Sequence, residues 1–247
     1  MKKIGILGGV GWPSTIEYYK LICENSQHYH RDNNFSGQIP MPEMVIESLD
    51  MAFTINNRGS SEPGSWTTWD TYFKEALHRL QQSGAELIAI ASVTPHARLN
   101  EITREITVPV ISVYQCIAEY CVQAGIKQLL VLGTMPTMSN SAFVDAMAKS
   151  DINAFYPETD DLKQKVVTVI DALYQNQIEG TASALDQIVR TCIEDGPQEE
   201  IAVCLGCTEL PLAFGSQVRV ARIQNRGIDY LNSSVIHAAA VFKACVS

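Results

Sequence analysis

The sequence contains no apolar run of about 18 residues, the length that a membrane-spanning helix needs. Its first apolar stretch ends at Val10, which is too short for the core of a secretion signal. Basic residues are also scarce, because 18 Lys and Arg face 27 Asp and Glu and leave a net charge of −9. Neither nucleic acid nor an anionic membrane surface is attracted to such a chain. We therefore expect a cytoplasmic protein that binds a small molecule, with a local positive site if that molecule is an anion.

Cysteine patterns that bind metal are missing as well. The seven cysteines include one C-x-x-C pair, Cys204 and Cys207, and the sequence has no second such pair and no His-x₃₋₅-His. This pattern disfavours both a zinc site and a redox pair. An odd number of cysteines without a secretion signal indicates reduced thiols. Cys204 lies inside an apolar run and is expected in the core, and no metal is expected.

Short apolar runs alternate with segments of helical periodicity along the chain. This alternation is typical of parallel sheets that are covered by helices on both faces. We therefore predict an α/β fold of two pseudo-symmetric lobes, parallel sheets covered by helices, with the active site in the cleft between them. The strands are predicted at residues 3–8, 43–48, 86–91, 128–133 and 200–205, with shorter ones near 108–111, 153–156 and 218–222.

Two pairs of similar segments support the division into halves. Ser92 and Cys207 lie 115 residues apart, close to half of the chain, and each comes after an apolar run and before a predicted helix start. Residues 5–9 and 130–134 form a second pair of strand ends at similar spacing. The predicted domains are an N-terminal lobe at 1–111, a C-terminal lobe at 112–222, and a segment at 223–247 whose helix, expected at 229–245, packs back across the lobes.

The segments around Ser92 and Cys207 also carry the chemistry. Thr94 before a proline, and Thr208 before Glu209, are typical of residues that begin a helix. Cys207 is therefore expected directly before a helix N-terminus, where partial positive charge stabilises a thiolate. Two such strand ends facing each other would place a hydroxyl and a thiol on opposite sides of a cleft. That arrangement is what proton exchange at one carbon requires.

Other polar segments have simpler interpretations. His96 and His237 are possible acid/base groups, but a lone histidine on a helix more often packs or forms a hydrogen bond. Residues 5–11 are rich in glycine but lack the G-x-G-x-x-G spacing of a dinucleotide site, so we expect them to let the backbone approach a small ligand. Ser14 is expected to cap the following helix. The polar loop at 56–65 is either a solvated connection or a lid.

Three segments carry a resemblance to a known family. They are residues 5–9 with Ser14, residues 132–138 (Leu-Gly-Thr-Met-Pro-Thr-Met), and residues 205–212 (Leu-Gly-Cys-Thr-Glu-Leu-Pro-Leu). Over essentially its full length the chain resembles the cofactor-independent aspartate/glutamate racemases. The resemblance implies two α/β lobes, a homodimer, and no metal, pyridoxal phosphate or other cofactor. It also implies two facing cysteines that remove and return the proton at Cα, and Cys207 matches the second of them.

The first cysteine of the family is replaced here. The family motif Cys-Asn-Thr-x-His aligns with residues 92–96, so Ser92 stands at the cysteine and Val93 at the asparagine that grips the substrate carboxylate. A branch of the family that resembles this chain has a hydroxyl residue at the Ser92 position and prefers L-amino acids. Val93 cannot form a side-chain hydrogen bond, and losing such a bond to a charged oxygen costs about 1.5–3 kcal/mol.

We therefore predict an amino-acid racemase that acts on a small acidic amino acid, aspartate or glutamate, with the L form preferred. Cys207 and Ser92 are the predicted catalytic residues. Two alternatives stay open, namely a decarboxylase or isomerase that needs one thiol, and a ligand-binding protein without turnover. The resemblance also implies substrate-binding residues, namely Gly9, Ser48, Thr94, Thr134, Thr137 and Thr208. The predicted basic residue that binds a substrate carboxylate is Lys165, with Lys163 as the neighbouring option, and Arg58 is a second candidate.

Overall fold

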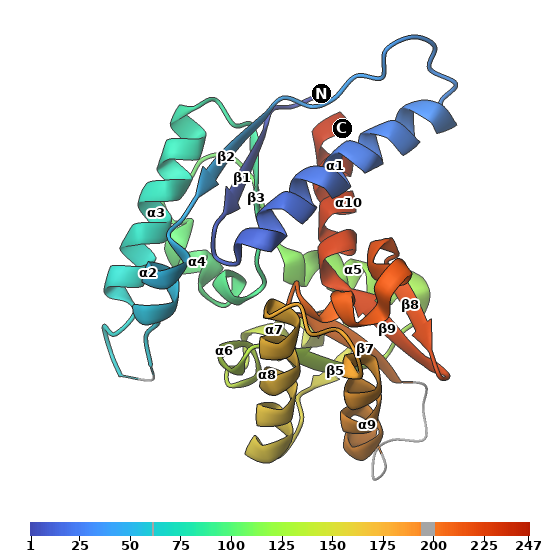
Figure 1. The fold of residues 1–247 in the computed structure, drawn as a ribbon. Helices are drawn as coiled ribbons and strands as arrows, with labels where there is room; N and C mark the ends of the chain where they lie inside the picture. The colour runs from blue at the N-terminus through green and yellow to red at the C-terminus, as the bar shows by residue number, and fades with distance from the viewer. Residues whose placement is uncertain (61, 194–200) are drawn as a thin grey trace. The chain divides into compact units, whose positions relative to one another are not determined.

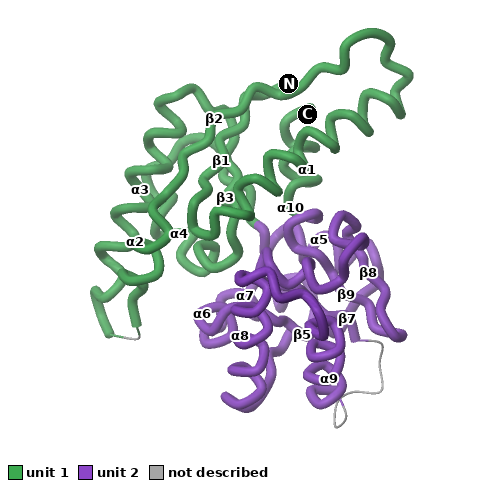
Figure 2. Tube along the Cα trace, in the orientation of Figure 1, with its two compact units in different colours: residues 1–112, 237–247 green, residues 113–236 purple. Residues whose placement is uncertain are grey.

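The computed structural model describes residues 1–60, 62–193 and 201–247. These residues divide into two units, which are described separately (Figure 2). Unit 1 consists of Met1–Ser112 and His237–Ser247, and unit 2 of Val113–Ile236. Within the described ranges, no helix is long and apolar enough to cross a membrane.

Unit 1 is built on a four-stranded parallel sheet with the order β2-β1-β3-β4. The central strands are the apolar runs β1 (Ile4–Gly8) and β3 (Leu87–Ile90), and every residue in both is buried. The sheet is completed by β2 (Met44–Ser48) and the short β4 (Val110–Ile111). The strands predicted at 3–8, 43–48 and 86–91 are therefore confirmed, and the one near 108–111 is reduced to two residues.

Helices cover both faces of this sheet (Figure 1). The amphipathic α3 (Thr67–Gln82) buries Trp69, Phe73 and Leu77 against β1 and β3, and α1 (Trp12–Asp32) lies on the opposite face. The remaining helices of unit 1 are α2 (Met51–Asn56), the 3₁₀ helix η1 (Thr94–Arg98), α4 (Leu99–Ile102), and the part of α10 (Ser233–Val246) from His237 onward.

Unit 2 is built on a five-stranded sheet with the order β6-β5-β7-β9-β8. All neighbours pair in parallel except β8 (Arg222–Asn225) and β9 (Ile228–Asn232), which pair antiparallel. The other strands are β5 (Gln128–Gly133), β6 (Asn153–Phe155) and β7 (Ile201–Gly206). The helices are α5 (Val113–Ala124), α6 (Met135–Met138), α7 (Ala142–Ala148), α8 (Asp160–Tyr174), α9 (Thr181–Ile193) and the 3₁₀ helix η2 (Leu210–Arg219).

The C-terminal part of unit 2 differs from the sequence prediction. The prediction of a strand near 218–222 is wrong, because η2 continues to Arg219 and β8 begins only at Arg222. A two-residue turn at Arg226 and Gly227, both with positive φ, then folds β9 back onto β8. The helix expected from residue 229 starts at Ser233, where the Asn232 side chain accepts hydrogen bonds from the first-turn amides. Residue 200 of the strand predicted at 200–205 lies outside the described residues.

Candidate functional site

In unit 1 the predicted site residues lie at the carboxyl edge of the sheet. Gly8 at the end of β1 pairs in register with Ser48 at the end of β2, and Leu7 pairs with Ile90 at the end of β3. Because parallel strands end at one edge, Gly9, Ser48 and Ser92 follow or end neighbouring strands there. This is the edge at which open α/β sheets bind ligands.

Gly9 is required by a close approach of two backbones. Its φ is +78°, and a Cβ at this position would lie 2.2 Å from the carbonyl oxygen of Leu49. The Gly9 amide donates a hydrogen bond to Thr15 Oγ1 at 2.9 Å. The backbone at Gly9 therefore lies directly against Leu49, the residue that follows β2. The prediction that Ser14 caps the following helix is wrong, because α1 begins at Trp12 with Gly11 as its N-cap, and Ser14 lies inside the helix.

The segment after β3 places Ser92 ahead of a short 3₁₀ helix. Val93 rather than Thr94 occupies the N-cap position of η1, and Thr94 is the first residue of that helix. Val93 and Thr94 are buried, whereas Ser92 is half-buried. The far end of η1 is fixed to α3, because Arg98 donates from Nε to Asp70 Oδ1 at 3.0 Å and forms a second contact with the other carboxylate oxygen. Ser92 therefore precedes a segment whose far end is held by a partly buried ion pair.

The two candidate histidines are buried in unit 1 beside each other, with ring centroids 5.5 Å apart. His237 Nε2 lies 2.9 Å from the carbonyl oxygen of Ile111, which can only accept, so this nitrogen carries the proton. Its Nδ1 then accepts from the Tyr18 hydroxyl at 2.8 Å. Burial lowers the pKa of His237 to about 4, and burial together with the neighbouring His237 lowers the pKa of His96. Both rings are neutral near pH 7, which agrees with a packing role.

In unit 2 the predicted site residues also gather at a carboxyl edge. The last residues of the neighbouring strands β5 and β7, Gly133 and Gly206, pair in register, so Thr134 and Cys207 follow directly after them. A Cβ on Gly206 would lie 2.9 Å from the carbonyl oxygen of Leu132, so the strand ends approach closely. Thr134 Oγ1 lies 3.1 Å from Oγ1 of the buried Thr137. Hydroxyls and a thiol thus lie at one sheet edge.

Cys207 contacts a carboxylate that the sequence interpretation did not assign. The thiol is 5% exposed and donates from Sγ to Glu209 Oε2 at 3.1 Å. Thr208 Oγ1 donates to the same oxygen at 2.9 Å. Glu209 is 2% exposed, and its other oxygen, Oε1, is buried with no hydrogen-bond partner among the described residues. In the sequence, the acidic residue two positions after Cys207 was the feature that could have predicted this contact.

The helix after Cys207 also differs from the prediction. It is the 3₁₀ helix η2, which begins at Leu210, has Glu209 at its N-cap position and is kinked at Gly215. Thr208 is therefore not the cap. We expected the positive end of an α-helix beside the thiol, and the structure places the carboxylate of Glu209 in contact with it.

Most of the other cysteines match the expected core role, because Cys116, Cys121, Cys204 and Cys245 are buried, whereas Cys23 and Cys192 are half-buried. All seven are free thiols, and Cys204 is fully buried in β7, where burial raises the pKa of its thiol well above the usual value. Within the described residues, no group of three or more His, Cys, Asp and Glu side chains is placed to hold a metal ion.

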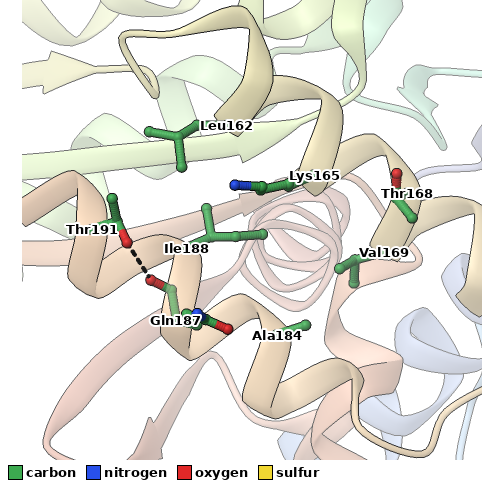
Figure 3. Close-up of a pocket in the computed structure, with 8 residues that line it drawn as sticks. All are labelled: Leu162, Lys165, Thr168, Val169, Ala184, Gln187, Ile188 and Thr191. Atoms are coloured by element: carbon green, nitrogen blue, oxygen red, sulfur yellow. Dashed lines mark hydrogen bonds between the residues drawn. The ribbon is translucent and has the colours of Figure 1, made fainter.

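Lys165 lies on α8, in a groove between α8 and α9 (Figure 3). Its ammonium group is 2.7 Å from Asp161 Oδ2 and its side chain is 58% exposed. The groove has a volume of about 320 Å³, and its lining residues include none of the predicted strand-end residues. Lys163 is only 18% exposed and lies 3.5 Å from Asp160. Of the two lysines, Lys163 is the more enclosed.

Arg58 lies in the segment that follows α2, and its side chain is half-buried. This polar loop, expected at 56–65, is held by its own hydrogen bonds. Ser65 Oγ contacts the carbonyl oxygens of Ser60 and Glu62, and Trp66 Nε1 donates to the Ser60 carbonyl oxygen at 3.0 Å. Residue 61 of the predicted loop lies outside the described residues.

Comparisons with known proteins agree on one family. The sequence profile described as Asp/Glu/hydantoin racemase matches residues 7–240. The broad specificity amino-acid racemase RacX of Bacillus subtilis is 24% identical over 209 residues, which cover 84% of this chain and 85% of that protein. The structure of an aspartate racemase homologue from Pyrococcus horikoshii is 27% identical, with a TM-score of 0.77 and full coverage of both chains. A Picrophilus torridus aspartate racemase structure has a TM-score of 0.72 at 18% identity, covering all of this chain and 95% of its own.

Proposed function

Because the chain belongs to the Asp/Glu/hydantoin racemase family, we propose that it is an amino-acid racemase that exchanges the proton at Cα of a small acidic amino acid, with the L form preferred and without pyridoxal phosphate. The observation that carries the proposal is the buried thiol of Cys207 directly after β7, at a sheet edge lined by hydroxyls. The relatives named as amino-acid or aspartate racemases support the reaction class.

In this proposal Cys207 removes and returns the Cα proton on one face of the substrate. Ser92 is the weaker donor that acts on the opposite face of the same carbon. The substrate carboxylate is only a weak electron sink for the carbanion formed on loss of the proton, so the reaction needs preorganised hydrogen-bond donors to that carboxylate. The hydroxyls of Thr134, Thr137 and Thr208 are the proposed donors, and Gly9, Ser48 and Thr94 are proposed to line the other half of the site.

A decarboxylase is the second candidate, and the sequence at residues 92 and 93 favours it. Loss of carbon dioxide generates the carbanion without a base, so one proton donor is enough. Ser92 in place of a thiol, and the buried Val93 in place of an asparagine, remove two groups that two-way racemisation uses. A test of the proposal must therefore include malonates as well as amino acids.

Solvent deuterium incorporation at Cα, followed by NMR across a panel of L- and D-amino acids and substituted malonates, tests the proposal. We expect incorporation into aspartate or glutamate, fastest for the L form. Cys207→Ala should abolish it while the protein stays folded. Cys204→Ala is the matched control, since it removes a buried thiol from β7, three residues before Cys207, and should keep most of the activity. Release of carbon dioxide from malonates without exchange into any amino acid would favour the decarboxylase instead.

A further inference from the structure

A buried carboxylate joins the first turn of α3 to the end of η1. Asp70 lies in that turn and is buried. Arg98, the last residue of η1, donates from Nε to Asp70 Oδ1 at 3.0 Å and also contacts the other carboxylate oxygen. Burying an unpaired carboxylate is costly, so Asp70 needs this partner. Two contacts to one carboxylate also fix the orientation of the guanidinium group, which a single contact does not.

The same guanidinium group lies over the indole ring of Trp66, 5.4 Å from the ring centroid. A cation in this position is attracted by the face of the ring. Trp66 directly precedes α3, and its ring packs against the polar loop, because a Cβ on Gly59 would lie 2.5 Å from the ring. Its Nε1 donates to the carbonyl oxygen of Ser60 at 3.0 Å. Arg98 therefore contacts a ring that is itself fixed between α3 and the loop.

The helix that ends at Arg98 depends on such contacts. A 3₁₀ helix of five residues has poorer hydrogen-bond geometry than an α-helix, so η1 is weak by itself. Its middle residues, Pro95 and His96, are buried and hold η1 against the core of unit 1. Burial of the middle alone leaves a short helix able to tilt. The contacts of Arg98 with α3 remove this freedom, and Ser92 lies two residues before the other end of η1.

Resting on the proposed function, we infer that Arg98 is a positioning residue for Ser92. Together with Asp70 and Trp66 it fixes the orientation of η1, and it thereby sets where the Ser92 hydroxyl meets the substrate. Arg98 itself does not touch the substrate. In the proposed reaction Ser92 serves one face of Cα and Cys207 serves the other, so loss of Arg98 should slow only the step on the Ser92 face. A displacement of about 1 Å slows such a step by up to about 10²-fold.

The ratio of racemisation to Cα exchange with retention is the readout, because a general loss of stability lowers both rates together. Arg98→Gln should lower this ratio by about 10–10²-fold, while exchange through Cys207 stays within about threefold of the native rate. Arg98→Lys keeps the charge but not the two-point contact, and should retain part of the ratio. NMR and chiral chromatography measure both rates in one reaction mixture. If native racemisation is too slow to measure, Arg98→Gln is made in the Ser92→Cys, Val93→Asn variant.

Two further variants test whether the ion pair is the cause. Asp70→Asn should lower the ratio in the same way, and the double variant with Arg98→Gln should be no worse than the stronger single variant, because both remove one interaction. Arg190→Gln is the matched control. Arg190 lies on α9 and donates from Nε to the buried Asp186 at 3.1 Å, away from the predicted site residues. This variant should lose stability and keep the native ratio.

Hydrogen–deuterium exchange of the backbone amides of residues 91–98, followed by mass spectrometry, separates this inference from the proposed function because it needs no substrate. Arg98→Gln should speed this exchange about fivefold or more, and Arg190→Gln should not. If the native protein exchanges no Cα proton, the proposed function fails, and the amides still report on η1. Trp66→Leu, which leaves the ion pair in place, replaces Arg98→Gln if that variant does not fold. Native amide exchange or a native ratio in the variant used, or an equal loss of the ratio in Arg190→Gln, overturns the inference.

Discussion

Tyr18 and His237 lie 219 residues apart in the sequence and are joined by a buried hydrogen bond of 2.8 Å between the Tyr18 hydroxyl and Nδ1 of His237. The other ring nitrogen donates to the carbonyl oxygen of Ile111 at the end of β4. One neutral imidazole thus connects α1, α10 and the edge of the sheet in unit 1. These two hydrogen bonds place a titratable side chain in the core of unit 1.

The first prediction is that acid destabilises the protein through His237. Burial lowers its pKa from 6.5 to about 4 in the folded state. Between these two pH values the imidazole is therefore protonated in the unfolded chain and neutral in the folded chain. Stability is full above about pH 6.5 and falls as the pH drops toward 4. Between pH 7 and pH 5 this group alone should lower the free energy of unfolding by about 2 kcal/mol. Urea unfolding at the two pH values measures the difference.

His96 adds to the same trend, because its pKa is also lowered in the folded state. His237→Gln should reduce the loss of stability between pH 7 and pH 5, although the variant is less stable at pH 7. His28, which is exposed on α1, is the control, and His28→Gln should leave the pH dependence unchanged. An unchanged pH dependence in His237→Gln would show that this histidine does not cause the acid sensitivity.

The second prediction compares two glycines with nearly the same φ. Gly9 has φ +78° and its Cβ would lie 2.2 Å from the Leu49 carbonyl oxygen, whereas Gly180 has φ +80° and open space around it. Gly180→Ala should cost about 1–2 kcal/mol, the strain of a left-handed backbone. Gly9→Ala must also displace the end of β2 and should lose clearly more, or fail to fold. Thermal unfolding of both variants measures the difference, and equal losses would contradict the close approach.

The third prediction concerns the basic residue that holds the distal carboxylate of the substrate. Lys163, Lys165 and Arg58 are each replaced by Met, and KM is measured for a dicarboxylate and a monocarboxylate amino acid. We expect Lys163→Met to raise the KM of the dicarboxylate about tenfold or more relative to the monocarboxylate, the usual loss of a charge-assisted hydrogen bond. Lys165→Met should change little, since this side chain is 58% exposed and lies in a groove that none of the predicted strand-end residues lines. A selective effect of Lys165→Met or Arg58→Met would move the assignment to that residue.

The fourth prediction concerns the unequal pair of Ser92 and Cys207. A serine hydroxyl protonates a carbanion poorly, so the carbanion should usually recapture its proton from Cys207. Deuterium exchange with retention of configuration should therefore be faster than racemisation in the native protein. Ser92→Cys combined with Val93→Asn should raise racemisation toward the exchange rate, measured by NMR together with chiral chromatography. Comparable racemisation of both enantiomers by the native protein would show that Ser92 is a competent acid or does not act on that carbon.

The central strands were predictable from sequence because buried parallel strands are short, apolar and flanked by turn residues. The strands β8 and β9 were missed for a physical reason. Their pairing depends on the turn at Arg226 and Gly227, and a short apolar run such as 228–232 is also compatible with a helix. The capping side chain of Asn232 marks the boundary between β9 and α10, and it was the sequence feature that could have separated them.

The site was predictable in its residue types and less so in its local geometry. The motif around Cys207 identified the thiol, but Ser14, Thr94 and Thr208 were all assigned as helix caps that the structure does not have. A cap contributes only about 1 kcal/mol, so packing at the sheet edge decides where a helix begins. The hydrogen bond from Cys207 to Glu209 depends on the backbone path between them, which no residue preference specifies.

Unit 1 is assembled from two distant stretches of the chain. The amide of Lys2 donates to the carbonyl oxygen of Cys245 at 2.9 Å, and His237 lies against Tyr18. During synthesis on the ribosome, the first sheet is made early but lacks its last helix until the residues from 237 onward have been added. Unit 2 is a continuous stretch and needs no later residue. The half of the protein that is translated first is therefore the half that is completed last.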